Sequence, residues 1–266
     1  MNAHSPSEAE ITVTADGPVR IVTLNRPNEL NAFTRTMHRA ITDVWRRIAA
    51  DTDARAVVLT GAGRAFSAGG DFDWMQRTHQ DPAQAAAAVD EAGELIQEML
   101  RFPLPVVAAV NGPAVGLGCS LTILSDLVVM AGSAHLADPH VSIGLVAGDG
   151  GVLWPLVMGL HRAKEFLFLG ARVAADDALA FGLANRVVPA EDVLPQALEW
   201  AHVLAAKPAA ALRDTKAALN TYASTLTGPA LRVGLVSERA SMGSADHGER
   251  LARLRPTVTT PKRQID

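Results

Sequence analysis

Two side chains able to carry a proton stand beside Gly-rich turns in the middle of the chain. His140 follows Asp138 and Pro139, and Asp149 lies in the run Gly148-Asp149-Gly150-Gly151. An unperturbed histidine titrates near neutral pH and serves as acid or base, and a carboxylate serves as a base. His140 and Asp149 are therefore candidates for acid/base catalysis. His140 also suits a hydrogen-bonded pocket edge, and Asp149 also suits a turn that caps the next helix.

A second feature is the stretch at residues 105–131, PVVAAVNGPAVGLGCSLTILSDLVVMA. Residues 106–110 predict a buried strand, turn residues follow at 111–116, and the residues after Gly116 suit a packed helix. A strand that enters a helix through a Gly-rich turn presents unpaired backbone N–H groups at the start of that helix. Such groups bind an anion or a developing oxyanion, although an ordinary strand-helix-strand connection has the same pattern.

Apolar runs and helical periodicity predict elements that alternate along the chain. Strands are expected at 11–14, 19–24, 56–60, 106–110, 127–131 and 186–188. Helices are expected from Asn31 or Thr34 to about Ala50, and at 82–100, 152–158, 163–169, 174–181 and 194–206. Alternation of this kind predicts a mostly parallel sheet with right-handed crossovers. Residues 10–205 are thus predicted as a β/α core, and 206–266 as a helical region with a possible stop at Gly228-Pro229.

Composition narrows the class of protein. The 266 residues are 48% apolar and 20% charged, which is typical of a globular protein with a substantial core. The net charge of −4 gives no reason to expect nucleic acid or an anionic membrane as partner. The single cysteine, Cys119, excludes a disulfide framework and fits a reducing cytoplasm. No apolar run approaches the ~20 residues that are needed to cross a bilayer.

Several sequence motifs of other enzyme classes are missing. No G-x-G-x-x-G follows the first predicted strand, and neither a P-loop nor H-E-x-x-H nor G-x-S-x-G occurs. Dinucleotide binding, nucleotide hydrolysis, zinc proteolysis and serine-hydrolase chemistry therefore lose their main support. We expect no metal ion and no separate cofactor.

The Gly-rich segments resemble those of the enoyl-CoA hydratase/isomerase, or crotonase, superfamily. The likeness is carried by GAGRAFSAGGDF at 61–72, AAVNGPAVGLGCSLTILSD at 108–126, the segment 139–151, LNRPNELNAF at 24–33 and ADDALAFGLANRVVP at 175–189. The resemblance implies an α/β fold of the ClpP/crotonase type, a spiral of β-β-α units with two roughly perpendicular sheets. It also implies a C-terminal helical region that forms a homotrimer or a dimer of trimers.

The resemblance further implies an acyl-CoA thioester as ligand, with coenzyme A as part of the substrate. The backbone N–H groups of Gly70 and Leu117 would bind the thioester oxygen and stabilise an enolate. Leu117 departs from the glycine that is common at this place, so its side chain would narrow the acyl site. Other substrate-binding residues implied by the matched motifs are Arg26, Leu30, Ala32, Ala68, Gly69, Asp71, Phe72, Gly116, Pro139 and Gly144, with Arg26 or Lys216 for the CoA phosphates.

The catalytic side chains depart from the hydratase pattern. Typical hydratases of this superfamily carry two glutamates, and here Ser120 and His140 stand in their places. The side chains left to move a proton are His140, Asp149 and Ser120, of which Ser120 is a poor base unaided. We expect hydration or double-bond isomerisation of an enoyl-CoA. The alternative is an acyl-CoA-binding protein of the same fold that has lost hydratase activity.

Overall fold

The structure is a computed structural model, and it describes residues 9–254. A six-stranded sheet forms its centre, in the order β1 (Ile11–Asp16), β2 (Val19–Leu24), β3 (Ala56–Gly61), β4 (Val106–Val110), β6 (Leu127–Ala131) and β9 (Arg186–Val188). β1 and β2 pair antiparallel as a hairpin around Gly17, and every other neighbouring pair is parallel. This arrangement confirms the predicted strands and the mostly parallel pairing.

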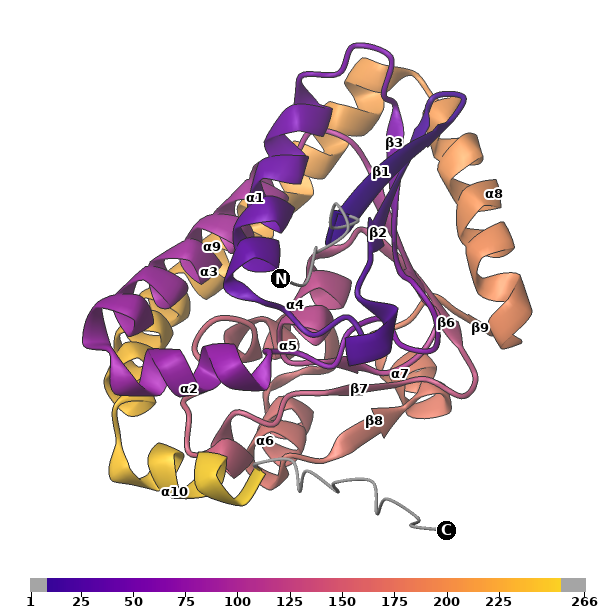
Figure 1. The fold of residues 1–266 in the computed structure, drawn as a ribbon. Coiled ribbons are helices and arrows are strands. Elements are labelled where there is room, and N and C mark those ends of the chain that lie inside the picture. The colour runs from indigo at the N-terminus through magenta and orange to yellow at the C-terminus, as the bar shows by residue number, and fades with distance from the viewer. Residues whose placement is uncertain (1–8, 255–266) are drawn as a thin grey trace, which may run out of the picture.

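Helices cover both faces of this sheet. α8 (Val193–Ala205) packs on one face, whereas α1 (Arg35–Ala49) and α3 (Pro82–Arg101) lie together on the other (Figure 1). β3 and β4 are buried along their whole length, which explains why their sequences are continuous apolar runs rather than alternating ones. α1 starts at the cap residue Thr34, whose hydroxyl accepts a hydrogen bond from the Met37 amide at 3.1 Å.

A second, smaller sheet lies below the first in Figure 1. It consists of β5 (Ala114–Val115), β7 (His135–Ala137) and β8 (Arg172–Ala174), and short helices surround it: α4 (Leu117–Leu124), α5 (Trp154–Met158), α6 (Leu160–Leu169) and α7 (Ala175–Phe181). Strands of two or three residues carry no readable alternation, so the second sheet was expected only from the family resemblance and its strands were not predicted individually. This sheet positions the site, because the turns that form the site follow β5 and β7.

One helix was missing from the predicted elements. α2 (Phe72–Gln80) begins directly after the Gly-rich loop that ends β3. Asp71 caps it by accepting a hydrogen bond from the Trp74 amide at 3.2 Å. The sequence FDWMQRTHQ is short and mixed, and only Trp74 and Thr78 are buried, so its periodicity is weak.

The C-terminal part is helical, as predicted. α9 (Ala209–Met242) runs alongside α3, and α10 (Ala245–Leu254) follows it (Figure 1). The predicted stop at Gly228-Pro229 is wrong, because α9 continues through Pro229. Contacts with α3 on both sides of the proline hold the helix: Asn220 donates to the Leu100 carbonyl at 2.8 Å, and Arg239 pairs with Asp90 at 2.5 Å. Residues 255–266 of the predicted helical region lie outside the described residues.

None of the helices within residues 9–254 is long and apolar enough to cross a membrane.

Candidate active site

Two Gly-containing turns from distant parts of the chain lie side by side. Ser67 and Ala114 form a parallel bridge, and the Val115 amide donates to the Ser67 carbonyl at 2.9 Å. Because the two segments run in the same direction, the residues that follow each of them turn at the same place. The loop after β3 and the turn before α4 thus meet at Gly69 and Gly116.

Backbone geometry requires glycine at both positions. Gly69 has a φ of +89° and Gly116 a φ of +52°, conformations that side chains disfavour. A Cβ atom on Gly69 would also lie 3.1 Å from the Val115 carbonyl oxygen. The glycines therefore allow the two turns to approach each other closely, which brings Gly70 and Leu117 to the wall of one cavity.

This cavity has a volume of about 310 Å³. Of the site residues predicted from the sequence, it is lined by Ala68, Gly69, Gly70, Gly116, Leu117, Pro139, His140 and Asp149. Within residues 9–254, no loop or side-chain acceptor is found for the N–H of Gly70 or of Leu117. Leu117 is the first residue of α4, so its N–H has no partner inside the helix. Both amides are thus free to donate to a ligand.

A buried aspartate orients His140. Nδ1 of His140 lies 2.5 Å from Oδ1 of Asp138, and the His140 amide donates to the same oxygen at 3.1 Å. Burial raises the pKa of Asp138, but the His140 charge and hydrogen bonds outweigh this effect and leave that pKa lowered. Asp138 therefore holds Nδ1 and orients the ring, so that Nε2 is the ring nitrogen left for other partners.

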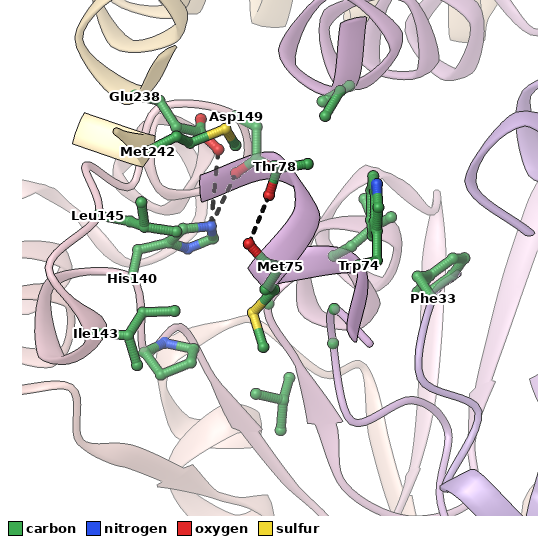
Figure 2. Close-up of a pocket in the computed structure, with 18 of the residues that line it drawn as sticks. Phe33, Trp74, Met75, Thr78, His140, Ile143, Leu145, Asp149, Glu238 and Met242 are labelled. Atoms are coloured by element: carbon green, nitrogen blue, oxygen red, sulfur yellow. Dashed lines mark hydrogen bonds and ion pairs between the residues drawn. The ribbon is translucent and has the colours of Figure 1, made fainter. Parts of the chain in front are cut away.

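Nε2 of His140 faces two further carboxyl groups. It lies 3.9 Å from Oδ1 of Asp149 and 3.9 Å from Oε1 of Glu238 (Figure 2). Burial lowers the pKa of His140, but the charges of Asp138, Asp149 and Glu238 outweigh it and hold that pKa well above its usual range. Burial raises the pKa of Glu238 well above its usual range, and the neighbouring Asp149 adds to this effect.

The other end of the cavity is mainly apolar, with His38 beside Trp74 at 5.1 Å between ring centroids. In Figure 2, Phe33 and Trp74 lie on the side away from His140, and Met75 lies between these two residues and His140. The wall there is completed by small side chains of α3, among them Ala88 and Ala92. The cavity thus joins an apolar compartment to a cluster of proton-carrying groups, and the two free amides lie in its wall.

Ser120 does not line this cavity. Its hydroxyl donates to the Gly116 carbonyl inside α4 at 3.3 Å, and the residue is 2% exposed. It packs against Gly150, where an added Cβ would lie 1.8 Å from the Ser120 oxygen. Ser120 therefore contributes to packing between α4 and the Asp149 loop in this arrangement.

Residues of the N-terminal motif stabilise the loop instead of lining the cavity. Arg26 forms ion pairs with Glu10 at 3.3 Å and with Asp71 at 3.5 Å, and it also donates to the Ala32 carbonyl. Leu30, Ala32, Phe72 and Gly144 likewise lie outside the cavity wall. Leu30 does contribute a carbonyl that accepts from the Ala68 amide at 2.9 Å, and so it supports the turn.

Lys216 is not a free cation. Its Nζ donates to Asp126 at 2.7 Å and to the Leu104 carbonyl at 2.7 Å, and the residue is buried. Burial lowers the pKa of Lys216, against the effect of Asp126. This ion pair ties α9 to the end of β6, so Lys216 is wrong as a candidate for binding a CoA phosphate.

Glu238 is the site residue that sequence reasoning missed. It belongs to α9, far along the chain from the other members, and the motifs that identified the cavity end before it. In the structure Gly234, Glu238 and Ser241 share one face of the helix, and Gly234 and Glu238 are buried, which the sequence alone does not show. A buried glutamate at that spacing marks a contact whose partner the sequence does not name.

The same three groups could also ligate a metal ion. In the part of the chain that the structure describes, His140, Asp149 and Glu238 form one set whose donor atoms lie within 4.8 Å of one another. An imidazole and two carboxylates are ligands that divalent metals accept. Metal binding and proton transfer are thus the two chemistries open to this cluster.

The sequence of this chain is similar to those of known proteins. A sequence model of the enoyl-CoA hydratase/isomerase family matches residues 14–246. A 1,2-epoxyphenylacetyl-CoA isomerase from Escherichia coli is 32% identical over 237 residues, which are 87% of this chain and 89% of that protein. A mevalonyl-coenzyme A hydratase from Beauveria bassiana is 36% identical over 214 residues, which are 76% of this chain and 75% of that protein.

Solved structures share the fold of this chain. The crystal structure of an enoyl-CoA hydratase/isomerase from Mycobacterium paratuberculosis superposes with a TM-score of 0.89 at 42% identity, and the match covers 94% of this chain and 100% of that one. The mixed fold and the C-terminal helical region are therefore shared with that structure. The names of the similar proteins include both hydratases and isomerases.

Proposed function

Since the chain belongs to the enoyl-CoA hydratase/isomerase family, we propose that it catalyses proton transfer beside the carbonyl of an acyl-CoA thioester. Hydration and double-bond isomerisation of an enoyl-CoA both pass through an enolate of that thioester. Coenzyme A enters as part of the substrate. One observation carries the proposal: Gly70 and Leu117, whose amides have no acceptor among the described residues, line the same cavity as His140.

The two amides stabilise the enolate. Removal of a proton from the α carbon places negative charge on the thioester oxygen, and fixed N–H donors stabilise that charge more than they stabilise the neutral carbonyl. Loss of one such donor typically raises a barrier by about 2.7–4 kcal/mol. Gly69 supports this role because it lets the turn adopt a positive φ and approach a ligand without a side chain in the way.

Asp149 and His140 move the proton. Asp149 lines the cavity with its Oδ1 atom 3.9 Å from Nε2 of His140, and it is the base at the α carbon. The charges of Asp138, Asp149 and Glu238 outweigh the effect of burial and raise the pKa of His140, which favours the protonated ring beside Asp149. The ring then passes the proton onward through Nε2.

The apolar compartment holds the acyl chain. Phe33, Trp74 and Met75 offer surface to a hydrocarbon or ring and no acceptor for a charged group (Figure 2). Leu117 projects from the turn that supplies an amide, so its side chain limits the width of the acyl group near the reacting carbons. These contacts favour a substrate whose acyl part is apolar away from the thioester.

The runner-up function is acyl-CoA binding without turnover. It is favoured by Ser120 and His140, which stand where typical hydratases carry glutamates, and by the hydroxyl of Ser120, which bonds back into its own helix. A protein of this kind would bind a saturated acyl-CoA and leave its α protons in place.

Exchange of α protons tests the proposal directly. Butanoyl-CoA in D₂O gains deuterium at the α carbon when an enzyme forms the enolate, and mass spectrometry measures the gain. We expect exchange in the wild type and a loss of about 10² or more in Asp149→Asn and His140→Gln, as for other acid/base groups. If neither variant differs from the wild type by tenfold, the assignment of these residues is wrong. Binding of butanoyl-CoA without any exchange or turnover identifies the runner-up.

A further inference from the structure

Glu238 brings a carboxyl group into the cavity from α9. Its side chain is 4% exposed, and its Oε2 atom has no hydrogen-bond partner among the described residues. An unpaired buried polar atom is destabilising, and such atoms are rare in native structures. Because Glu238 lines the cavity, a ligand or a water molecule bound there is the natural partner for this group.

Contacts on both sides of Glu238 fix its position. One turn before it, Gly234 meets Gly148 so closely that a Cβ on Gly148 would lie 2.2 Å from the Gly234 carbonyl oxygen. One turn after it, the Ser241 hydroxyl accepts from the Val146 amide at 3.0 Å. The helix is therefore fastened to the loop that carries Asp149, and Glu238 is placed as firmly as the loop residues themselves.

His140 stands between the two carboxyl groups. Its Nε2 atom is 3.9 Å from Asp149 and 3.9 Å from Glu238, and Figure 2 shows the two side chains approaching the ring from the same side. Nδ1 is held by Asp138, so the ring cannot turn away without losing that bond. A proton can thus pass between the carboxyls through one nitrogen after a small movement of either side chain.

The two carboxyl groups are placed to serve as an acid and a base. Each lies 3.9 Å from Nε2 of His140, so one can give up a proton while the other takes one. Burial, and next to it the neighbouring Asp149, raise the pKa of Glu238 well above its usual range, which suits Glu238 to the acid role.

We propose that Glu238 is the general acid in a reversible addition of water to the β carbon, with Asp149 as the base at the α carbon. The two groups then serve in place of the glutamates that are absent at positions 120 and 140. The substrate class is a 2-enoyl-CoA, with the matching 3-hydroxyacyl-CoA as product. This inference rests on the proposed function, because the enolate must form at Gly70 and Leu117 in either case.

The step balances in the direction of water loss. Asp149 takes the α proton, and the electron pair of the C–H bond moves into the thioester carbonyl. The enolate electrons then return to form the α,β double bond, the bond between the β carbon and the hydroxyl breaks, and the hydroxyl leaves as water with the proton of Glu238. The protonated His140 ring reprotonates Glu238 and takes the proton from Asp149, which restores the starting state.

Two assays separate this step from enolate formation. Deuterium exchange into butanoyl-CoA needs Asp149, the His140 ring and the two amides but no acid at the β carbon, since this substrate has no leaving group. Interconversion of 2-butenoyl-CoA, 2-octenoyl-CoA and 2-dodecenoyl-CoA with their 3-hydroxy products needs the acid as well. In Glu238→Gln we expect interconversion to fall at least 100-fold and to fall at least 30-fold more than exchange does. Glu249→Gln, an exposed glutamate on α10, is the matched control and should leave both rates as in the wild type.

Each outcome of these assays supports or overturns a stated assignment. Equal rates in Glu238→Gln and wild type overturn the assignment of Glu238, and so does a wild type that exchanges α protons without water addition to any of the three enoyl-CoAs; the proposed function survives both. A wild type without exchange overturns the proposed function. Transfer of label from H₂¹⁸O into the 3-hydroxyl group needs no variant and confirms water addition even if Glu238→Gln fails to fold. Loss of activity in EDTA, restored by a divalent metal, makes the cluster a metal site and contradicts the acid role.

Discussion

A Cβ atom on Gly234 would lie 2.7 Å from the carbonyl oxygen of Gly148, so α9 and the loop of Asp149 meet backbone to backbone. No side chain fits between them. The contact sets the distance from Glu238 to His140, and a Cβ on Gly148 would also lie 2.9 Å from Oε2 of Glu238.

Gly234→Ala should therefore lower activity without altering any proton-carrying group. The methyl group must push α9 away from the loop, and overpacking of this kind costs about 1–3 kcal/mol of folding free energy. We expect water addition to fall at least tenfold, with a measurable drop in the melting temperature. Gly243→Ala, at the end of the same helix with open space around its Cβ, is the control. Equal activity in Gly234→Ala and Gly243→Ala would show that the glycine contact does not position Glu238.

Local patterns in the sequence were sufficient for the elements that bury long apolar runs. β3 and β4 are such runs, and α1 shows its cap residue and its buried face in the sequence. The differences between the predicted and the observed elements have physical causes. β5 and β7 are too short to show a period, and α9 passes through Pro229 because packing against α3 outweighs the missing amide.

Some residues of the candidate site could likewise be predicted from local patterns, and others could not. Gly70, Leu117, His140 and Asp149 lie in motifs with recognisable turns, and the structure brings them to one cavity. Glu238 joins them through a tertiary contact between α9 and a loop, for which a single sequence contains no signal. Lys216 looked like an available cation because the sequence does not show that Asp126 lies 2.7 Å from it.

Asp138→Asn should shift the pH dependence of α-proton exchange. Asp138 raises the pKa of His140, and the proposed reaction uses the protonated ring. Activity in the wild type should fall as pH rises through that pKa. Without the Asp138 charge the pKa of His140 is lower, so the decline should begin at a lower pH.

At pH 8 we expect exchange in Asp138→Asn to be about 10² slower than in the wild type, at the lower end of the range for acid/base groups. Rates measured from pH 6 to pH 10 in D₂O buffers provide the comparison. Asp126→Asn removes a carboxylate that pairs with Lys216 outside the cavity, and so it controls for the loss of an ion-paired carboxylate. A parallel decline in wild type and Asp138→Asn, with no displacement along the pH axis, would contradict the role of Asp138.

His247 should make α10 sensitive to acid. The residue is buried, and its Nδ1 atom lies 2.7 Å from the Ile143 carbonyl, which makes it a link between α10 and the cavity wall. Burial lowers the pKa of His247, although the Ile143 carbonyl opposes this effect. The unfolded chain thus binds the proton more readily than the folded protein. The stability that neutral His247 provides is present above its unfolded pKa of about 6.5 and is lost as pH falls below it.

Melting temperatures at pH 8 and pH 5.5 measure this effect. In His247→Asn the amide can still donate to Ile143 but does not titrate, so the difference between the two temperatures should shrink. His161→Asn, at an exposed position on α6, should keep the wild-type difference. If His247→Asn also keeps it, another group controls the acid sensitivity.

A strip of exposed apolar side chains runs along α9. Leu219, Tyr222, Leu226 and Val233 are between 52% and 69% exposed, and their spacing places them on one side of the helix. An exposed strip of this kind is typical of a surface that another protein covers. We expect a second copy of this chain to cover it, in a homotrimer or a dimer of trimers.

Light scattering coupled to size-exclusion chromatography measures the mass in solution. The wild type should show three or six times the mass of one chain, and the double variant Leu226→Glu with Val233→Glu should shift toward the monomer, because two charges cannot be buried at such an interface without partners. Thr221→Glu adds a charge on another exposed side of α9 and should leave the assembly intact. A wild type that elutes with the mass of one chain at micromolar concentration would remove the strip as an interface between copies.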